Sequence, residues 1–308
     1  MYKYITDQQS EQRIWIEWKP YRAKFSTHAG KDKPRKESVQ RVKELVALLQ
    51  SDKPSDFCTP PCVGYFDDRD DSDESEHEYR FGLVFEMPAN ASGPVSLHQL
   101  IERDTKPSLT DRILLAHKIA KCMLYLHTVN WLHKAFRSDS ILFFTTDGNT
   151  DLTAPYLSGY EYARPDKKGE TTTSTDADWW WQLYIHPDYQ NKSPKPDYQK
   201  TFDVYSLGLV LLEIIHWKHI EDIVGIDPKS RPESVQEVRE RLLQSGGQVA
   251  ELRGNHGDKV WCAVESCISG RAAFGISEDE NEMDIETAAT LQREFTGKVV
   301  EPLGSICI

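Results

Sequence analysis

The chain has 308 residues, with 49 acidic side chains against 37 basic ones, so its formal net charge at pH 7 is -12. A field of that sign repels phosphate backbones and anionic lipid, which argues against nucleic acid and membrane surfaces as partners. Hydrophobic residues make up 39% of the chain, as in folded proteins. No signal-peptide region opens the sequence and no apolar run is long enough to span a bilayer, so we expect an intracellular, cytoplasmic chain without a membrane span.

The first 90 residues have the composition of strands around one helix. Residues 13–21 (RIWIEWKPY) are β-branched and aromatic, which predicts a strand. Residues 37–50 place apolar side chains at helical spacing. Two more strands are expected at 62–66 and 79–88. The stretch 67–78 (DDRDDSDESEHE) is a block of mostly like charge and is expected to form a loop.

From about residue 97 the pattern becomes helical. Residues 110–127 carry an apolar stripe behind Thr110, which we expect to be the N-cap. Residues 202–217 are apolar nearly all round, which predicts a buried central helix, and Asp203 at its start is placed to cap it or to hold a neighbouring loop. A further helical pattern covers 287–303. The sequence therefore predicts an α+β fold with strands first and helices after them.

The order of these elements resembles a protein kinase domain. A strand ending in Lys19, a helix, a strand ending in FEMP, a long helix, the stretch WLHKAFRSDSILFF at 131–144 and the buried central helix follow one another as in kinases. The resemblance is strongest to kinase-like domains of filamentous fungi that sit beside HeLo-type, prion-inhibition-and-propagation modules of heterokaryon-incompatibility proteins. It implies a bilobal fold, with a small β-rich N-lobe over 1–92, truncated or reduced, and a helical C-lobe over 93–308.

The resemblance also shows which catalytic residues are missing. Kinases carry H-R-D-x-K-x-x-N where this chain reads HKAFRSDS, so His133 matches the His, Ala135 the Asp, Arg137 the Lys and Ser140 the Asn. Alanine cannot accept a proton, so the general base is absent. In APYLSGYEYARP, Gly159 matches the metal-binding Asp of the D-F-G motif. The base and both metal ligands are therefore expected to be lost, and no metal site is predicted.

The nucleotide-binding part is reduced as well. Lys19 matches the lysine that pairs with ATP, yet the first glycine of the chain is Gly30, so no glycine-rich phosphate loop precedes it. Either the chain is a fragment that starts inside the small lobe, or its first strands are reduced. On the following helix, Arg41 falls near the position of the glutamate that pairs with this lysine, and Glu44 lies one turn further on.

The remaining matched positions form two groups. A vestigial nucleotide site is expected to comprise Lys19, Arg137, Glu86 and Met87. The scaffold residues of the kinase fold are expected to be His133, Asp188 of the IHPDY stretch, and Asp203. In the activation-segment position, Thr171–Thr175 are either phosphate acceptors or part of a polar loop, and Trp179–Trp181 either form a partner patch or pack on the large lobe.

Three functions fit this pattern. The first is a pseudokinase, an interaction or signalling module that has a protein partner, requires no cofactor and binds ATP or ADP weakly and without metal. The second is an atypical active protein Ser/Thr kinase in which Asp139 or Glu161 serves as metal ligand. The third is a small-molecule phosphotransferase, which would need the same missing acids. The loss at 135, 140 and 159 together favours the first.

Overall fold

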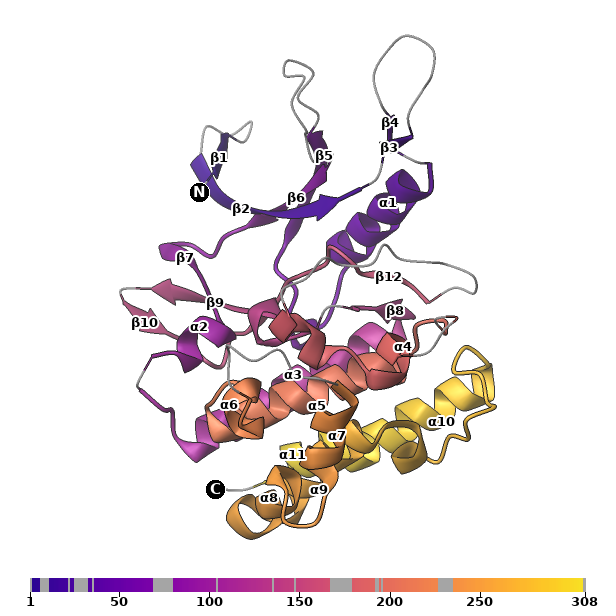
Figure 1. The fold of residues 1–308 in the computed structure, drawn as a ribbon. Coiled ribbons are helices and arrows are strands. Elements are labelled where there is room, and N and C mark those ends of the chain that lie inside the picture. The colour runs from indigo at the N-terminus through magenta and orange to yellow at the C-terminus, as the bar shows by residue number, and fades with distance from the viewer. Residues whose placement is uncertain are drawn as a thin grey trace.

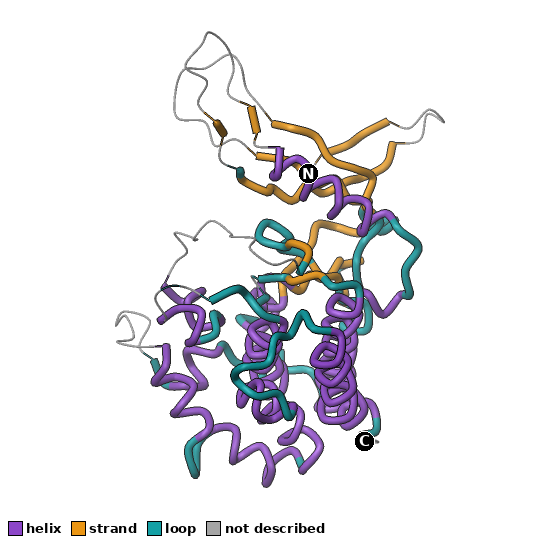
Figure 2. Tube along the Cα trace, turned by 90° about the vertical axis from the view of Figure 1, so that its right-hand side faces the viewer, coloured by secondary structure: helices purple, strands orange, loops and turns teal. Residues whose placement is uncertain are grey.

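The computed structural model describes residues 2–5, 11–21, 23–24, 33–34, 36–68, 80–103, 105–134, 136–146, 148–166, 179–191, 194, 196–226 and 235–306. Strands predominate in the N-terminal half of the chain and helices in the rest of it, which confirms the predicted α+β class (Figure 1). In Figure 2 the larger sheet lies at one end of the molecule and most of the helices lie at the other. Residues 69–78 of the predicted acidic loop, Ala135 and Thr171–Thr175 lie outside the described residues.

The larger sheet is built from the strands predicted in the first 90 residues. Its order is β1 (Tyr2–Ile5), β2 (Glu11–Pro20), β6 (Arg80–Glu86) and β5 (Cys62–Asp68), and every neighbouring pair is antiparallel. Helix α1 (Lys36–Gln50) contacts β5, and Figure 1 shows it beside the sheet. The apolar face predicted from the helical spacing is the face that is buried, because packing removes apolar side chains from water and leaves the polar face of the helix solvated. Strands β3 (Ala23–Lys24) and β4 (Lys33–Pro34) form a separate pair.

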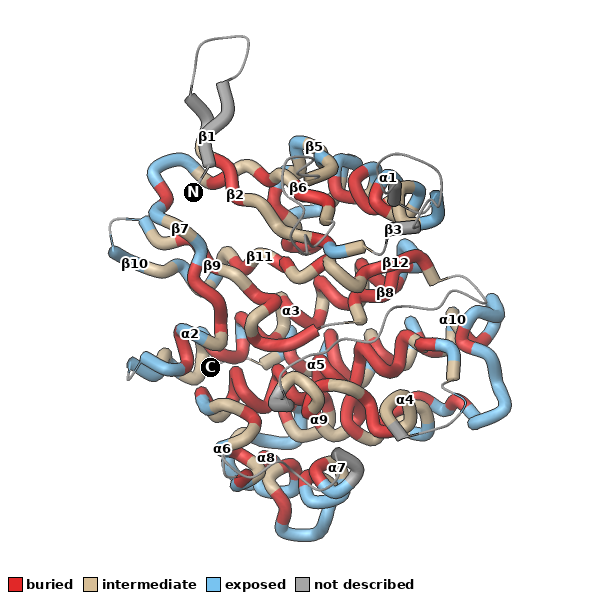
Figure 3. The backbone as a smooth tube through the Cα atoms, turned by 45° about the horizontal axis from the view of Figure 1, so that its top comes forward, coloured by how far each residue is buried: buried red, intermediate tan, exposed pale blue. Residues whose placement is uncertain are grey.

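Shorter strands lie between this sheet and the helices. Strand β9 (Ile141–Thr146) pairs with β7 (Ala91–Ser96), β10 (Asn149–Thr150) and β11 (Tyr156–Leu157). Strand β8 (Trp131–Leu132) pairs with β12 (Arg164–Pro165). These pairings bring the segment that leads into β9 and the segment that follows β11 to one place, as Figure 3 shows for β8, β9, β11 and β12.

The helical part is organised around α5 (Lys200–His216), which is buried along all but its last residue and packs on α3 (Leu109–Thr128) and α9 (Asp258–Ser269) (Figure 3). The remaining helices are α2 (Leu97–Ile101), α4 (Pro187–Asn191), α6 (Ile220–Val224), α7 (Val235–Leu243), α8 (Gln248–His256), α10 (Ile285–Phe295) and α11 (Glu301–Gly304). Short 3-10 turns span Ser55–Phe57, Ser138–Ser140, Trp179–Tyr184 and Gly270–Phe274, and a π-helical turn spans Thr296–Val300. In the described part of the chain, no helix combines the length and apolarity needed to cross a bilayer.

One predicted helix boundary is wrong. The structure begins α3 at Leu109, and the N-cap is Ser108, whose hydroxyl accepts a hydrogen bond from the Asp111 backbone N–H at 3.1 Å. Thr110 is therefore a helical residue rather than the cap. Two hydroxyl residues stand two positions apart here, and the one that precedes the helix can reach a free N–H of the first turn. In the predicted stripe Leu124 is half-buried, and the other positions are buried: Ile113, Ala116, Ile119, Ala120 and Met123.

Candidate functional site

Lys19 lies near the C-terminal end of β2 and points its ammonium group at the segment that follows β11. Its Nζ donates hydrogen bonds to the carbonyl oxygens of Tyr160 at 3.0 Å, Glu161 at 2.6 Å and Ala163 at 3.3 Å. An ammonium group has three N–H donors, so these three carbonyls use all of them. Lys19 therefore fastens β2 to residues 160–163 and has no donor left for a phosphate in this arrangement.

The surroundings of Lys19 lower its pKa but leave the side chain mostly protonated at pH 7. Burial lowers the pKa of the Lys19 side chain to about 8; the Glu161 carboxylate opposes that shift, and the nearby positive charge of Arg41 adds to it. Arg41 falls near the position that in kinases holds the glutamate paired with this lysine. The structure brings the arginine close enough to act on Lys19. Glu44, one turn further on, accepts a hydrogen bond from its neighbour Gln40 at 3.0 Å. A cation thus faces Lys19 from α1, where a kinase would supply an anion.

Glu17, two residues before Lys19, completes the connection and was missed by the sequence reasoning. Its Oε2 accepts hydrogen bonds from the backbone N–H groups of Gly159 at 3.1 Å and Tyr160 at 3.4 Å. Burial raises the pKa of Glu17 to about 8, and the negative charge of Glu161 adds to this effect. The period of two along a strand could have indicated this residue, because positions 17 and 19 project from the same face of β2.

Gly159 and Ser140, the two positions matched to metal ligands, lie in contact. Gly159 has φ +80°, in the left-handed region that side chains disfavour. A Cβ atom on Gly159 would lie 3.0 Å from the Ser140 Oγ and 3.5 Å from His133 Cε1. Gly159, Ser140 and His133 are therefore neighbours in space, but the contact with Ser140 leaves little room for a side chain at residue 159.

His133 and Asp203 form the buried support beneath these residues. The Asp203 carboxylate, 0% exposed, accepts hydrogen bonds from the backbone N–H groups of His133 and Lys134, both at 2.8 Å, and from the Tyr198 hydroxyl at 2.9 Å. The His133 ring, also 0% exposed, bonds through Nε2 to the Ser158 carbonyl at 2.8 Å. Asp203 thus holds the turn at 133–134 against α5, and His133 joins that turn to the residue before Gly159.

The pKa of Asp203 follows from these contacts. Burial alone would raise it, but the hydrogen bond from His127 at 3.4 Å, the electrostatic influence of the His127 and His133 rings and the N–H of Lys134 together hold the pKa below its ordinary value. Asp203 is therefore ionised at neutral pH. Burial lowers the pKa of His133, so that ring is neutral and donates from Nε2 to the Ser158 carbonyl.

Arg137 is held between an aromatic ring and two acids. Its guanidinium carbon lies 3.9 Å from the centre of the Trp181 ring. Its Nε is 3.6 Å from Asp139 Oδ2, and its Nη2 is 3.6 Å from Glu161 Oε1. The two carboxylates proposed as substitute metal ligands therefore both lie against one arginine, whose positive charge a metal ion would have to displace.

Glu86 and Met87 do not lie beside Lys19. In the pairing of β2 with β6, Lys19 is opposite Phe81 and Ile14 is opposite Glu86, so the two groups are separated by about 17 Å along the strands at ~3.3 Å per residue. The backbone N–H of Glu86 donates to the Pro61 carbonyl at 2.9 Å, and that of Met87 donates to the Arg13 carbonyl at 3.0 Å. Both donors already have intramolecular acceptors.

Two further features lie in the helical part. Asp188 belongs to the first turn of α4, where its backbone N–H donates to His186 Nδ1 at 3.1 Å. A surface hollow of about 310 Å³ lies between α3, α5 and α10, with Lys200, Leu124 and Phe295 in its lining. Neither feature includes Lys19, Gly159 or Ser140, so neither belongs to the site described above.

Comparison with known proteins gives two matches. The chain is similar to the serine/threonine-protein kinase-like protein At5g23170 of Arabidopsis thaliana, with 30% identity over 216 residues. The matched region is 68% of this chain and 58% of that protein, so the chain spans little more than half of the relative's length. A family model described as "Domain of unknown function (DUF7580)" matches residues 64–306. Because that match extends over most of the 308 residues, the chain belongs to the DUF7580 family.

Proposed function

We propose that this chain is a kinase-like domain of two lobes that has lost phosphotransfer and serves as a protein-interaction module. The similarity to a kinase-like protein supports the general class. The sheet order β1-β2-β6-β5, with α1 between β2 and β5 in sequence, supports a kinase-type small lobe at residues 1–92 ahead of a helical lobe at 93–308. The association with HeLo-type modules stays a prediction from the resemblance.

The observation that carries the proposal is the closure of the site by its own residues. Lys19 gives its three donors to the carbonyl oxygens of residues 160, 161 and 163, and Glu17 takes the N–H groups of Gly159 and Tyr160. In a working kinase the lysine contacts the phosphates, and the D-F-G segment presents an aspartate to magnesium. In this chain the lysine at that position binds the backbone of the segment matched to D-F-G instead.

The residues present do not fit a magnesium–nucleotide complex of the kinase type. Ser140 and Gly159 stand at the two metal-ligand positions, and a Cβ at 159 would lie 3.0 Å from the Ser140 Oγ, so a side chain there requires Ser140 to shift. Glu17 is protonated over much of the neutral range because burial raises its pKa to about 8, and a protonated carboxyl group is a poor ligand for a hard cation. We therefore derive no catalytic step through such a complex.

A second candidate function is an atypical kinase that uses Asp139 and Glu161. The observation in its favour is that both carboxylates approach the same arginine, each at 3.6 Å, and so lie near one another. Released from Arg137, they would form a pair of oxygen ligands of the kind that magnesium uses together with phosphates. The contact between Arg137 and Trp181 at 3.9 Å opposes that release.

Phosphate transfer distinguishes the two functions. Purified chain is incubated with radiolabelled ATP and magnesium or manganese, alone and with a generic protein substrate, beside the variants Glu161→Ala and Asp139→Ala. We expect the same background signal from all three proteins, because Ala135 offers no base and the metal ligands are absent. Turnover by the parent chain that disappears in either variant, and survives repurification, would establish the atypical kinase instead.

The partner proposed for the module is a protein with a basic surface. The formal charge of -12 at pH 7 favours such a partner, and association steered by charge slows as salt is added. For an identified partner, we expect the association rate to fall by tenfold or more between low and high ionic strength. A rate indifferent to salt would contradict this choice of partner.

A further inference from the structure

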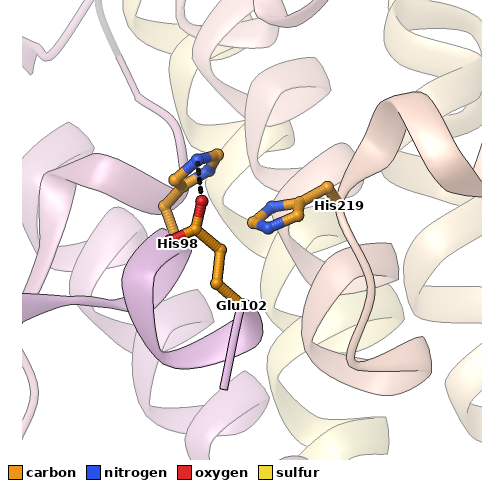
Figure 4. Close-up of side chains that lie close together, drawn as sticks. All are labelled: His98, Glu102 and His219. Carbon is orange, nitrogen blue, oxygen red and sulfur yellow. Dashed lines mark ion pairs between the residues drawn. The ribbon is translucent and has the colours of Figure 1, made fainter. Parts of the chain in front are cut away.

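Two histidines and a glutamate converge at a place that the kinase resemblance does not involve. His98 lies on α2 and Glu102 is its C-cap residue, while His219 immediately precedes α6 (Figure 4). One ligand atom from each of the three side chains lies within 4.8 Å of the others. The His98 and His219 ring centres are 4.1 Å apart, and His98 Nε2 is 3.8 Å from Glu102 Oε1. In the described part of the chain, this is the group of three His, Cys, Asp or Glu side chains whose ligand atoms all lie within 4.8 Å of one another.

These spacings suit a metal ion of small radius. Nitrogen and carboxylate oxygen bind Zn²⁺ at about 2.0–2.2 Å, which puts neighbouring ligand atoms of a tetrahedral site about 3.3–3.6 Å apart. The separation of 3.8 Å between His98 and Glu102 is already close to this range. Residues four apart on a helix face the same side, so His98 and Glu102 reach the ion together. Figure 4 shows the Glu102 carboxylate end and the His219 ring on the same side of α2.

The backbone on both sides of the cluster is fixed by hydrogen bonds. A capping box holds the start of α2: Ser96 Oγ accepts from the Gln99 N–H at 3.2 Å, and the Gln99 side chain accepts from the Ser96 N–H at 3.0 Å. On the other side, Glu213 Oε1 accepts from the Ile220 N–H at 3.1 Å, directly after His219. The ligands are therefore carried by two segments that need no reordering before an ion binds.

Glu213 also supplies an outer contact to His219. Its Oε1 lies 4.0 Å from His219 Nδ1, which is beyond hydrogen-bond distance but keeps a carboxyl group beside the imidazole. Both ring nitrogens of His219 are shielded from solvent, and neither makes a hydrogen bond within the described part of the chain. A buried imidazole without such partners has a lone pair to offer, and a metal ion would satisfy it.

The charges around the cluster favour a cation. Three carboxylates, Glu221, Asp222 and Glu102, lie near enough to act on the His219 ring. A doubly charged ion at the centre gains from these anions, and the two imidazoles serve as its ligands.

We propose that His98, Glu102 and His219 bind one divalent transition-metal ion of the Zn²⁺ class, with water in the fourth position, and that the ion links α2 to the connection between α5 and α6. Two imidazoles select this class against Mg²⁺ and Ca²⁺, which prefer all-oxygen sites. Glu102 has 61% of its side chain exposed, so solvent or an incoming ligand can reach the remaining position. The proposal does not depend on the loss of phosphotransfer.

Titration with zinc tests this site in the whole chain. The purified protein is stripped with a chelator and titrated with ZnCl₂ in competition with a chromophoric chelator, beside the variants His98→Ala, His219→Ala and Glu102→Gln. We expect one ion per chain, and we expect each variant to weaken binding at least tenfold, a change of about 1.4 kcal/mol. Cobalt in place of zinc should give the visible bands of a four-coordinate ion, and Glu102→Gln should reduce them.

A matched control separates the site from unspecific binding by histidine. His256→Ala removes one member of a second close pair, in which the His216 and His256 ring centres are 5.8 Å apart. We expect this variant to bind zinc as the parent chain does. Equal weakening in His256→Ala and His98→Ala, or the absence of saturable one-to-one binding, would overturn the proposal. If His219→Ala loses its circular dichroism signal, His98→Ala and Glu102→Gln decide the question, because their side chains are partly exposed.

Discussion

Replacement of Gly159 by aspartate, the residue a kinase would carry there, is expected to destabilise the fold. Two costs arise. A side chain at φ +80° costs about 1–2 kcal/mol, less for aspartate than for most residues. The new Cβ would lie 3.0 Å from Ser140 Oγ, and such overpacking typically costs about 1–3 kcal/mol. The added carboxylate would also join Glu17 and Glu161 in one poorly solvated place.

Gly148→Asp provides the matched control. Gly148 has φ +79°, almost the same backbone conformation, but apart from its chain neighbours no atom of the described residues lies within 4 Å of where its Cβ would be. It therefore bears the conformational cost without the close contact. By urea denaturation, we expect Gly159→Asp to lose about 2–4 kcal/mol more stability than Gly148→Asp, with Gly159→Ala between them because it adds the Cβ without the charge. Equal losses in the two aspartate variants would refute this account of the Gly159–Ser140 contact.

The same contact bears on repair of the catalytic residues. The triple change Ala135→Asp, Ser140→Asn and Gly159→Asp restores the base and both metal ligands of the kinase pattern. It also places two larger side chains where Ser140 and Gly159 now touch, and leaves Lys19 bound to three carbonyl oxygens. We expect no turnover within tenfold of the usual ~1–100 per second in a radiolabelled phosphate-transfer assay, and turnover in that range would show that the site can open.

Three further outcomes are expected in stability measurements. Asp203→Ala should lower the free energy of unfolding by roughly 2–5 kcal/mol, because it leaves two loop N–H groups and a tyrosine hydroxyl without their acceptor. The control Asp279→Ala, at an exposed position, should change it by no more than about 0.5 kcal/mol. Similar losses in both variants would refute this role of Asp203. The folded-state pKa of Glu17, about 8, exceeds the ordinary 4.5, so the folded chain retains a proton that the unfolded chain has lost and stability falls as the pH rises from about 5 to 8. Glu17→Gln should reduce that fall by roughly 2–4 kcal/mol, and an unchanged profile would contradict the burial of this carboxyl group. Lys19→Met should lower the melting temperature of the nucleotide-free chain, since three carbonyls lose their donor, and a temperature unchanged within error would indicate a lysine kept for an external ligand.

The elements of this fold were predictable from local pattern, because burial of one face imposes a period on the sequence. The helix at 37–50 was found in this way, and the central helix at 202–217 was found because it is apolar nearly all round; both agree with the structure to within two residues at either end. The position of Asp203 at the start of the central helix also suggested that it holds a neighbouring loop, because a carboxylate there faces free N–H groups. The cap of α3 was misplaced, since Ser108 and Thr110 have the same chemistry and the choice depends on where the preceding chain turns.

The site was only partly predictable, because its contacts join residues far apart in the chain. Lys19 was identified by its place at the end of a strand, but its carbonyl partners lie more than 140 residues further on. Glu17 reads as an ordinary polar position of a strand until the segment at 159–160 is placed against it. The metal cluster has the same origin: His98 and Glu102 are four apart on a helix, whereas His219 comes from a distant connection.

Nucleotide binding tests the central claim, closure of the site by Lys19 and Glu17, most directly. Calorimetric titration of the chain with ATP and with ADP, each with and without magnesium, measures whether the groups that now bind one another can be separated by a ligand. We expect binding weaker than about 100 µM, with less than a tenfold change on addition of magnesium. Tightening of tenfold or more, about 1.4 kcal/mol, that is lost in Lys19→Met would contradict the closed site and show that the lysine serves a metal–nucleotide complex.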